Sequence, residues 1–152
     1  MPKQTFETFP TIQFTVAGKA QPAGSKRGFK RGDKVIVVDA NAKSKQWQAI
    51  VKAAAVEAYG GPVLDGPIGI EMTFRSRRPR DHIRANGELK DWAKQQRPTS
   101  KPDALKLARG IEDALTGVIY RDDALIVVEW LEKCYADEGT PERVDVRIWR
   151  VL

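Results

Sequence analysis

The sequence predicts one α/β or α+β domain, in which a mixed β-sheet packs against two main helices. Its 152 residues match the ~150 residues of a typical single domain. Hydrophobic residues make up 41% of the chain and charged residues 30%, a composition typical of globular proteins with a buried core. Segments that alternate apolar and polar residues are interspersed with two segments of helical periodicity, which favours a sheet combined with helices.

The N-terminal part predicts two strands separated by a basic loop. Ile12, Phe14 and Val16 alternate with polar neighbours, a pattern typical of a half-buried strand. Residues 18–34 are rich in Gly, Lys and Arg and show no period, so we expect a loop or a loose hairpin tip. The β-branched residues of 35–40 then predict a short strand.

The most clearly predicted helix runs from about residue 42 to residue 59. Apolar residues recur there at helical spacing, and Gly60 and Gly61 end the pattern. Trp47 falls on the apolar face, so we expect it in the core. A second alternating segment, 68–74, predicts a further strand.

Residues 75–101 break all periodicity and carry eight Lys and Arg before Lys101. Long segments without structure inside a compact domain are uncommon and are often functional, so we predict a mobile basic loop with a short helix around 88–95. His82 is expected to be a solvated loop residue, with a phosphate contact as the alternative. Trp92, an aromatic residue among basic ones, is a candidate for stacking on a flat ring of a ligand.

The last third predicts a helix over 102–115, ended by Gly117. Two strands are expected to follow, broken near residues 121–123. Alternation over 144–148 predicts a C-terminal strand. No internal repeat or second core is evident, so the whole chain, 1–152, is predicted to be one domain.

Charge is distributed unevenly around a net value of +6. Residues 1–101 have a balance of +10, whereas residues 102–152 have a balance of −4. A basic pI by itself indicates little more than solubility, but a basic surface beside clustered carboxylates also suits a protein that holds a polyanion.

Several classes of protein are excluded or disfavoured by composition. A single cysteine, Cys134, excludes an intramolecular disulfide, and one histidine excludes a His-rich metal site. No apolar run approaches the ~20 residues of a membrane span, and the first ten residues lack the apolar core of a signal peptide. We therefore expect a cytosolic protein that does not act at a membrane.

The predicted helix over 102–115 has one face of charged residues. Asp103, Lys106, Arg109 and Asp113 fall within an arc of about 120° at 100° per residue. A solvated helix face would explain this pattern, and the adjacent Asp122 and Asp123 would suit a turn.

The alternative interpretation is a metal site. If Asp122 and Asp123 approach Asp103, the carboxylates form a cluster suited to Mg²⁺, which activates water in phosphodiester cleavage. Arg109 would then stabilise charge on the phosphate. The basic loops at 19–34 and 75–101 would hold the backbone of a nucleic acid.

A sequence motif supports the second interpretation. Lys101-Pro102-Asp103, Arg109, Asp113-Ala114-Leu115 and Asp122-Asp123 resemble the K-P-D…K…D-A-L…D-D pattern of RusA-type crossover junction endodeoxyribonucleases. These are small Holliday junction resolvases, common in phages and prophages. The match is dense over 101–128, and the order of elements before it also fits.

The resemblance implies a RusA-like fold, a homodimer and dependence on Mg²⁺, for which Mn²⁺ would substitute. It implies a nuclease that cuts branched DNA with paired nicks during recombination, repair or phage DNA processing, in the cytoplasm of a bacterial or phage-infected cell. Asp103 matches the first catalytic aspartate, Asp123 the one in the D-D pair, Arg109 the conserved lysine and Asp113 the D of D-A-L, which implies catalytic roles for these four residues. The implied metal ligands are Asp103, Asp113, Asp122 and Asp123.

The motif departs from the family pattern at one position. The family's second aspartate and the following asparagine fall on Leu105 and Lys106. Leu105 cannot ligate a metal, so either Asp113 or Asp122 substitutes, or one metal binds instead of two, or the protein binds DNA without efficient cutting. On the helical wheel Leu105 lies near the border of the buried arc.

The predicted DNA contacts are basic residues of the two loops and of the charged helix face, with one histidine: Lys26, Arg27, Arg75, Arg77, Arg78, Arg80, His82, Lys101 and Lys106. An active nuclease is the preferred hypothesis. A non-catalytic protein that binds branched DNA is the first alternative. A basic assembly protein, whose acidic residues only cap a helix, is the second.

Overall fold

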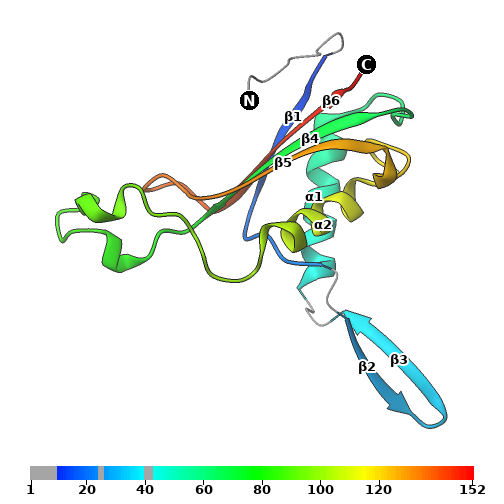
Figure 1. The fold of residues 1–152 in the computed structure, drawn as a ribbon, viewed down its shortest axis with the longest axis horizontal. Coiled ribbons are helices and arrows are strands. Elements are labelled where there is room, and N and C mark those ends of the chain that lie inside the picture. Colours follow the sequence, from blue (N-terminus) through cyan, green and yellow to red (C-terminus); the bar gives the residue numbers. More distant parts are fainter. Residues whose placement is uncertain (1–9, 24–25, 40–42) are drawn as a thin grey trace.

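The structure is a computed structural model that describes residues 10–23, 26–39 and 43–152. A four-stranded sheet of order β1-β6-β4-β5 forms its centre, and the two helices pack beside it (Figure 1). The strands are β1 (Ile12–Ala17), β4 (Ile68–Ser76), β5 (Ile126–Tyr135) and β6 (Arg143–Arg150). The predicted mixed sheet with two main helices is confirmed.

Alternation along β4 shows why one face of the sheet is covered. Ile68, Ile70, Met72 and Phe74 are buried in the core, which also contains residues of both helices. The opposite face carries polar side chains, and Arg147 on β6 pairs there with Glu71 at 3.1 Å. The helices therefore cover the apolar face, and the polar face stays open to solvent.

Strand direction explains the place of the second helix. β4 and β5 are parallel, whereas β1 with β6 and β6 with β4 are antiparallel. Parallel neighbours need a long crossover connection, and the chain between β4 and β5 includes α2 (Ala104–Leu115). Helix α2 thereby packs beside β5, at the edge of the sheet.

The helices form close to the positions that periodicity predicts. α1 spans Ser44–Ala58 and buries Trp47, which is 3% exposed, so this core residue is confirmed. α2 buries Leu107, Ile111, Ala114 and other small or apolar residues along one side. No helix in the described ranges is both long and apolar enough to cross a membrane.

The predicted loose loop is more regular than expected. Residues 26–31 form β2 (Lys26–Arg31), which pairs antiparallel with β3 (Lys34–Asp39). The hairpin turns at Gly32, whose φ of +66° suits glycine. In Figure 1 this hairpin projects away from the sheet and helices.

The basic segment after β4 also has local structure. It contains two short 3₁₀ helices, Arg80–His82 and Asp91–Ala93, and the backbone N–H of Lys90 donates to the carbonyl of His82 at 2.9 Å. The expectation that His82 is solvated is wrong. The residue is 8% exposed, because Trp92 and Tyr135 pack edge-on against its ring at centroid distances of 5.0 and 5.3 Å.

The strand predicted before Asp122 does not form. Residues 117–119 make a turn, and Tyr120 after it makes only isolated bridges to Leu64 and Thr116. Ile119 and Tyr120 are nonetheless fully buried, so the apolar pattern reflects core packing and not a strand. Only β5 follows.

Candidate active site

Helix α2 presents the charged face that its periodicity predicts. Because Leu107, Ala108 and Ile111 fix one side in the core, Lys106 and Arg109 are held on the exposed side. Leu105 is also on the surface, with 69% of its area exposed, and is not part of the core.

A cavity of about 240 Å³ lies between this helix and strand β5. Its lining combines two cationic, two anionic and one apolar side chain: Leu105, Lys106, Arg109, Glu112 and Glu129. The position that lacks the family's second aspartate, Leu105, therefore opens onto a site with two carboxylates of its own.

The two carboxylates of this cavity interact directly. Burial raises the pKa of Glu112 to about 8, and the hydrogen bond and charge of Glu129 add to the rise. The charges of Asp123 and Asp113 contribute smaller effects in the same direction. The repulsion between the two side chains therefore disfavours the charged form of Glu112, and a cation beside them would relieve it.

Sequence reasoning missed both Glu112 and Glu129. A weak signal existed, because Glu112 follows Leu105 by seven residues, two helical turns, and so lies on the same face. Glu129 also interrupts the apolar run of β5. Only the packing of α2 along β5 shows that the two side chains meet.

Hydrogen bonds from the following turn hold Glu112 in place. Its backbone carbonyl accepts from the hydroxyls of Thr116 and Tyr120, both at 2.9 Å, and from the Thr116 N–H at 3.1 Å. Tyr120 is completely buried, and burial raises its pKa far above the ordinary value. Tyr120 therefore acts as a neutral donor that anchors the end of α2.

The predicted Asp122-Asp123 pair lies where the chain enters β5. Asp122 accepts a hydrogen bond from the N–H of Ala124 at 2.8 Å, and this bond lowers its pKa. Asp123 begins a 3₁₀ turn, is exposed, and acts on Glu112 through its charge. Of the predicted acidic residues, Asp123 and Asp113 are thus electrostatically linked to the cavity.

Asp103 lies at the other end of α2. It is the exposed N-cap residue, and its side chain makes no capping hydrogen bond. Nine residues separate it from Glu112, or about 13 Å along the helix axis. Over 10–23, 26–39 and 43–152, no three His, Cys, Asp or Glu side chains are grouped closely enough to hold a metal ion. The four-aspartate ligand set stays a prediction.

The predicted DNA contacts divide into exposed and internal residues. Arg77, Arg80, Lys101 and Lys106 are exposed. Arg75 is partly buried and pairs with Asp145 at 2.7 Å.

Arg78 contacts other residues of the protein. It donates to the carbonyl of Ala93 at 2.8 Å and stacks on Tyr135 at 4.8 Å from the ring centroid. The side chains of Lys26 and Arg27 lie outside the described part of the structure.

Comparison with known proteins identifies the family of this chain. A family model described as "Endodeoxyribonuclease RusA" matches residues 14–149. The chain belongs to the RusA family. It is also 33% identical to the "Uncharacterized protein YqaN" of Bacillus subtilis (strain 168) over 142 residues, which cover 92% of this chain and 96% of the relative. The resemblance seen in the motif is therefore confirmed, and endodeoxyribonuclease chemistry is established at the level of the family.

The donor chemistry of the cavity fits a hard divalent cation. Mg²⁺ takes oxygen ligands and commonly uses only one or two protein carboxylates, completing its shell with water and phosphate oxygens. Glu112 and Glu129 supply two carboxylates whose mutual repulsion such a cation would neutralise. Arg109 and Lys106 supply positive charge for a phosphate beside them.

Proposed function

We propose that this RusA-family protein is a structure-selective endodeoxyribonuclease that depends on a divalent metal and cuts branched DNA. The proposed substrate is a Holliday junction, on which two copies of the chain make paired nicks. The proposed setting is the cytoplasm of a bacterial or phage-infected cell.

One observation carries the proposal beyond family membership: paired carboxylates and two cations line one open cavity. Glu112 and Glu129 are the anions, and Lys106 and Arg109 are the cations. Phosphodiester cleavage needs both kinds of charge, because the scissile phosphate is anionic and becomes more so in the transition state.

The proposed metal ligands are Glu112 and Glu129, with Asp123 supporting them. A bound Mg²⁺ or Mn²⁺ would supply a nucleophilic water at neutral pH and stabilise charge on the phosphate. The roles implied for Asp103, Asp113 and Asp122 stay proposals of the same kind. Asp103 is offered as a second acidic site at the N-terminal end of α2.

The chain's own residues have separable tasks in this proposal. Arg109 and Lys106 orient the scissile phosphate, while Tyr120 and Thr116 fix the backbone that carries Glu112. The raised pKa of Glu112 makes it a proton carrier near neutral pH when no cation is bound. Exposed arginines of the segment 77–101 hold the DNA backbone.

A second candidate function is non-catalytic binding of branched DNA. Leu105 favours it, because an exposed apolar side chain stands where the family motif has an aspartate. The Glu112–Glu129 pair favours catalysis, since it places two carboxylates in the cavity that Leu105 also lines.

A nicking assay separates these candidates. We expect the purified protein to nick a synthetic four-way junction at symmetric positions in Mg²⁺ or Mn²⁺, to leave linear duplex intact, and to stop when EDTA is added. Binding of the junction without nicking under any divalent cation would instead support the non-catalytic function. A Glu57→Gln variant, which alters an exposed carboxylate on α1, serves as the control for variants of Glu112 and Glu129 in the same assay.

A further inference from the structure

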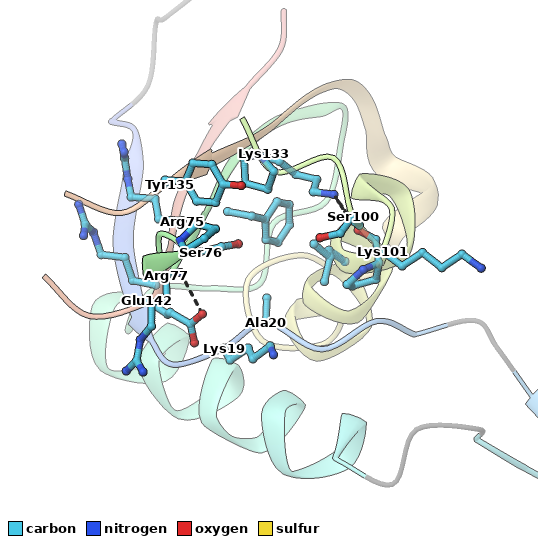
Figure 2. Close-up of a pocket in the computed structure, with 16 residues that line it drawn as sticks. Lys19, Ala20, Arg75, Ser76, Arg77, Ser100, Lys101, Lys133, Tyr135 and Glu142 are labelled. Atoms are coloured by element: carbon cyan, nitrogen blue, oxygen red, sulfur yellow. Dashed lines mark hydrogen bonds between the residues drawn. The ribbon is translucent and has the colours of Figure 1, made fainter. Parts of the chain in front are cut away.

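A second cavity of about 240 Å³ lies beside the start of α2, and its lining includes neither Glu112 nor Glu129 (Figure 2). It opens where the parallel strands β4 and β5 end, at Ser76 and Tyr135, and beside the start of α2 at Pro102. The carboxyl ends of parallel strands are a common ligand site in α/β sheets. The nuclease proposal places Arg77, at the edge of this cavity, on the DNA backbone, but gives no role to the interior of the cavity.

The inner wall of the cavity is largely apolar. Phe74 and Leu107, which are 2% and 5% exposed, line it together with Ala20, Pro98 and Pro102. An isolated phosphate would need N–H donors at such a wall, whereas a planar base would be stabilised by contact with it.

The rim of the cavity is basic, and two of its cations, Arg75 and Arg143, pair with Asp145. Six cationic side chains and one carboxylate, Glu142, line it; the cations are Lys19, Arg75, Arg77, Lys101, Lys133 and Arg143. Lys133 donates to the carbonyls of Ser100 and Pro102 at 2.8 and 2.9 Å, so it braces the wall. Within the described ranges, the Lys19 and Lys101 amines make no such bond, and Figure 2 shows Lys101 extending outward.

A rigid hydroxyl points into the cavity from Tyr135 (Figure 2). Arg78 stacks on one face of this ring and the buried His82 packs against it, so the ring is fixed before any ligand arrives. The hydroxyl makes no hydrogen bond with other described residues. It is therefore a preorganised donor and acceptor for a polar edge of a ligand.

We propose that this cavity takes the base of one unpaired nucleotide of branched DNA, while the flanking phosphates lie on the basic rim. The inference rests on the proposed function and specifies its substrate. Pockets for drug-sized ligands measure ~300–1,000 Å³, so the smaller volume suits a single base.

Strand β5 fixes the spacing between this cavity and the carboxylate pair. Lys133 lines the base cavity and Glu129 lines the proposed active site, four residues away on the same strand. Four residues of strand span about 13 Å. At ~3.4 Å per nucleotide of a duplex strand, the base that is read lies about four nucleotides from the cut.

The test compares two four-way junction probes in EDTA by fluorescence anisotropy. One probe has a single unpaired nucleotide at the branch point, and the other has an abasic residue at the same position. We expect at least a tenfold tighter Kd for the probe with the base. Equal Kd values for the two probes would overturn the inference.

Variants of the cavity test whether the base binds there. Ala20→Leu fills the cavity and is expected to abolish the difference between the probes, and Ala17→Leu, at an exposed position of β1, is expected to keep it. Tyr135→Phe keeps the ring contacts but removes the hydroxyl, so it is expected to reduce the difference even if Ala20→Leu folds poorly. A full difference in both Ala20→Leu and Tyr135→Phe would overturn the inference.

The outcomes also separate this inference from the proposed function. Normal nicking of the four-way junction with equal affinity for the two probes would reject the base cavity alone. Absence of binding to every DNA probe would reject both.

Discussion

At the scale of single residues, Glu112 links the stability of the protein to pH. Its pKa rises to about 8 on folding, so the stability that its proton provides is present at acidic pH and is lost as pH rises through about 8. Glu112→Gln carries no such proton. We expect its free energy of unfolding, relative to wild type, to increase between pH 5 and pH 9 in urea denaturation, and Glu57→Gln to show no such trend.

Divalent cations test the same residue in another way. At pH 8 we expect Mg²⁺ to raise the Tm of the wild type, because a bound cation stabilises the folded state by mass action. Glu112→Gln and Glu129→Gln should each lose most of this shift. A full Mg²⁺ shift in both variants would exclude the pair as the cation site.

Leu105 allows a gain-of-function prediction. Because its side chain is 69% exposed, Leu105→Asp should change the free energy of unfolding by no more than about 0.5 kcal/mol. The added carboxylate lies beside Glu112 and Glu129 and should lower the Mg²⁺ concentration for half-maximal nicking.

A neighbouring residue provides the matched control. Leu107→Asp buries an unpaired charge at a position that is 5% exposed, and should cost several kcal/mol. If Leu105→Asp is stable but leaves the Mg²⁺ dependence unchanged, position 105 does not face the metal.

The two aspartates taken from the family motif have separate predicted outcomes. Asp123→Asn should abolish nicking while DNA binding in EDTA is retained or improved, since a negative charge near the phosphates is removed. Asp103→Asn should do the same if the acidic site at the start of α2 takes part in cutting. Nicking at the wild-type rate by either variant would remove that residue from the active site.

At the scale of elements, the basic segment after β4 should control the salt dependence of DNA binding. Replacing the exposed Arg77 and Arg80 with Ala should reduce the slope of log K against log salt by about two, near 0.9 per lost phosphate contact. Arg78→Ala should instead lower Tm and leave the slope unchanged, because Arg78 donates a hydrogen bond to the carbonyl of Ala93 and stacks on the ring of Tyr135. An unchanged slope in Arg77→Ala/Arg80→Ala would mean that these side chains do not contact DNA.

Elements with strong local patterns were predictable from the sequence. The segments of alternating polarity, 12–16, 68–74 and 144–148, form β1, β4 and β6. The two segments of helical periodicity form α1 and α2. The hairpin strand β2 was missed, because its six residues carry four Lys and Arg and no apolar alternation. The apolar segment 118–120 is predicted as a strand but is not one. Periodicity alone does not distinguish a buried turn from a strand.

At the scale of the whole molecule, the candidate site shows where sequence reasoning stops. The charged face of α2 and the neighbourhood of Asp123 follow from spacing and motif. Glu112 and Glu129 become a pair only because α2 packs beside β5. The burial of His82 likewise depends on Trp92 and Tyr135, which come together through the fold.

The central claim is that the metal binds at the carboxylate pair between α2 and β5. The most direct measurement is the anomalous difference density of Mn²⁺ in a crystal soaked near pH 8. We predict a peak within ligand distance of the carboxylates of Glu112 and Glu129, on the side of α2 that carries Arg109. A peak at Asp103 with none at Glu112 and Glu129, or no peak at any carboxylate, would contradict the claim.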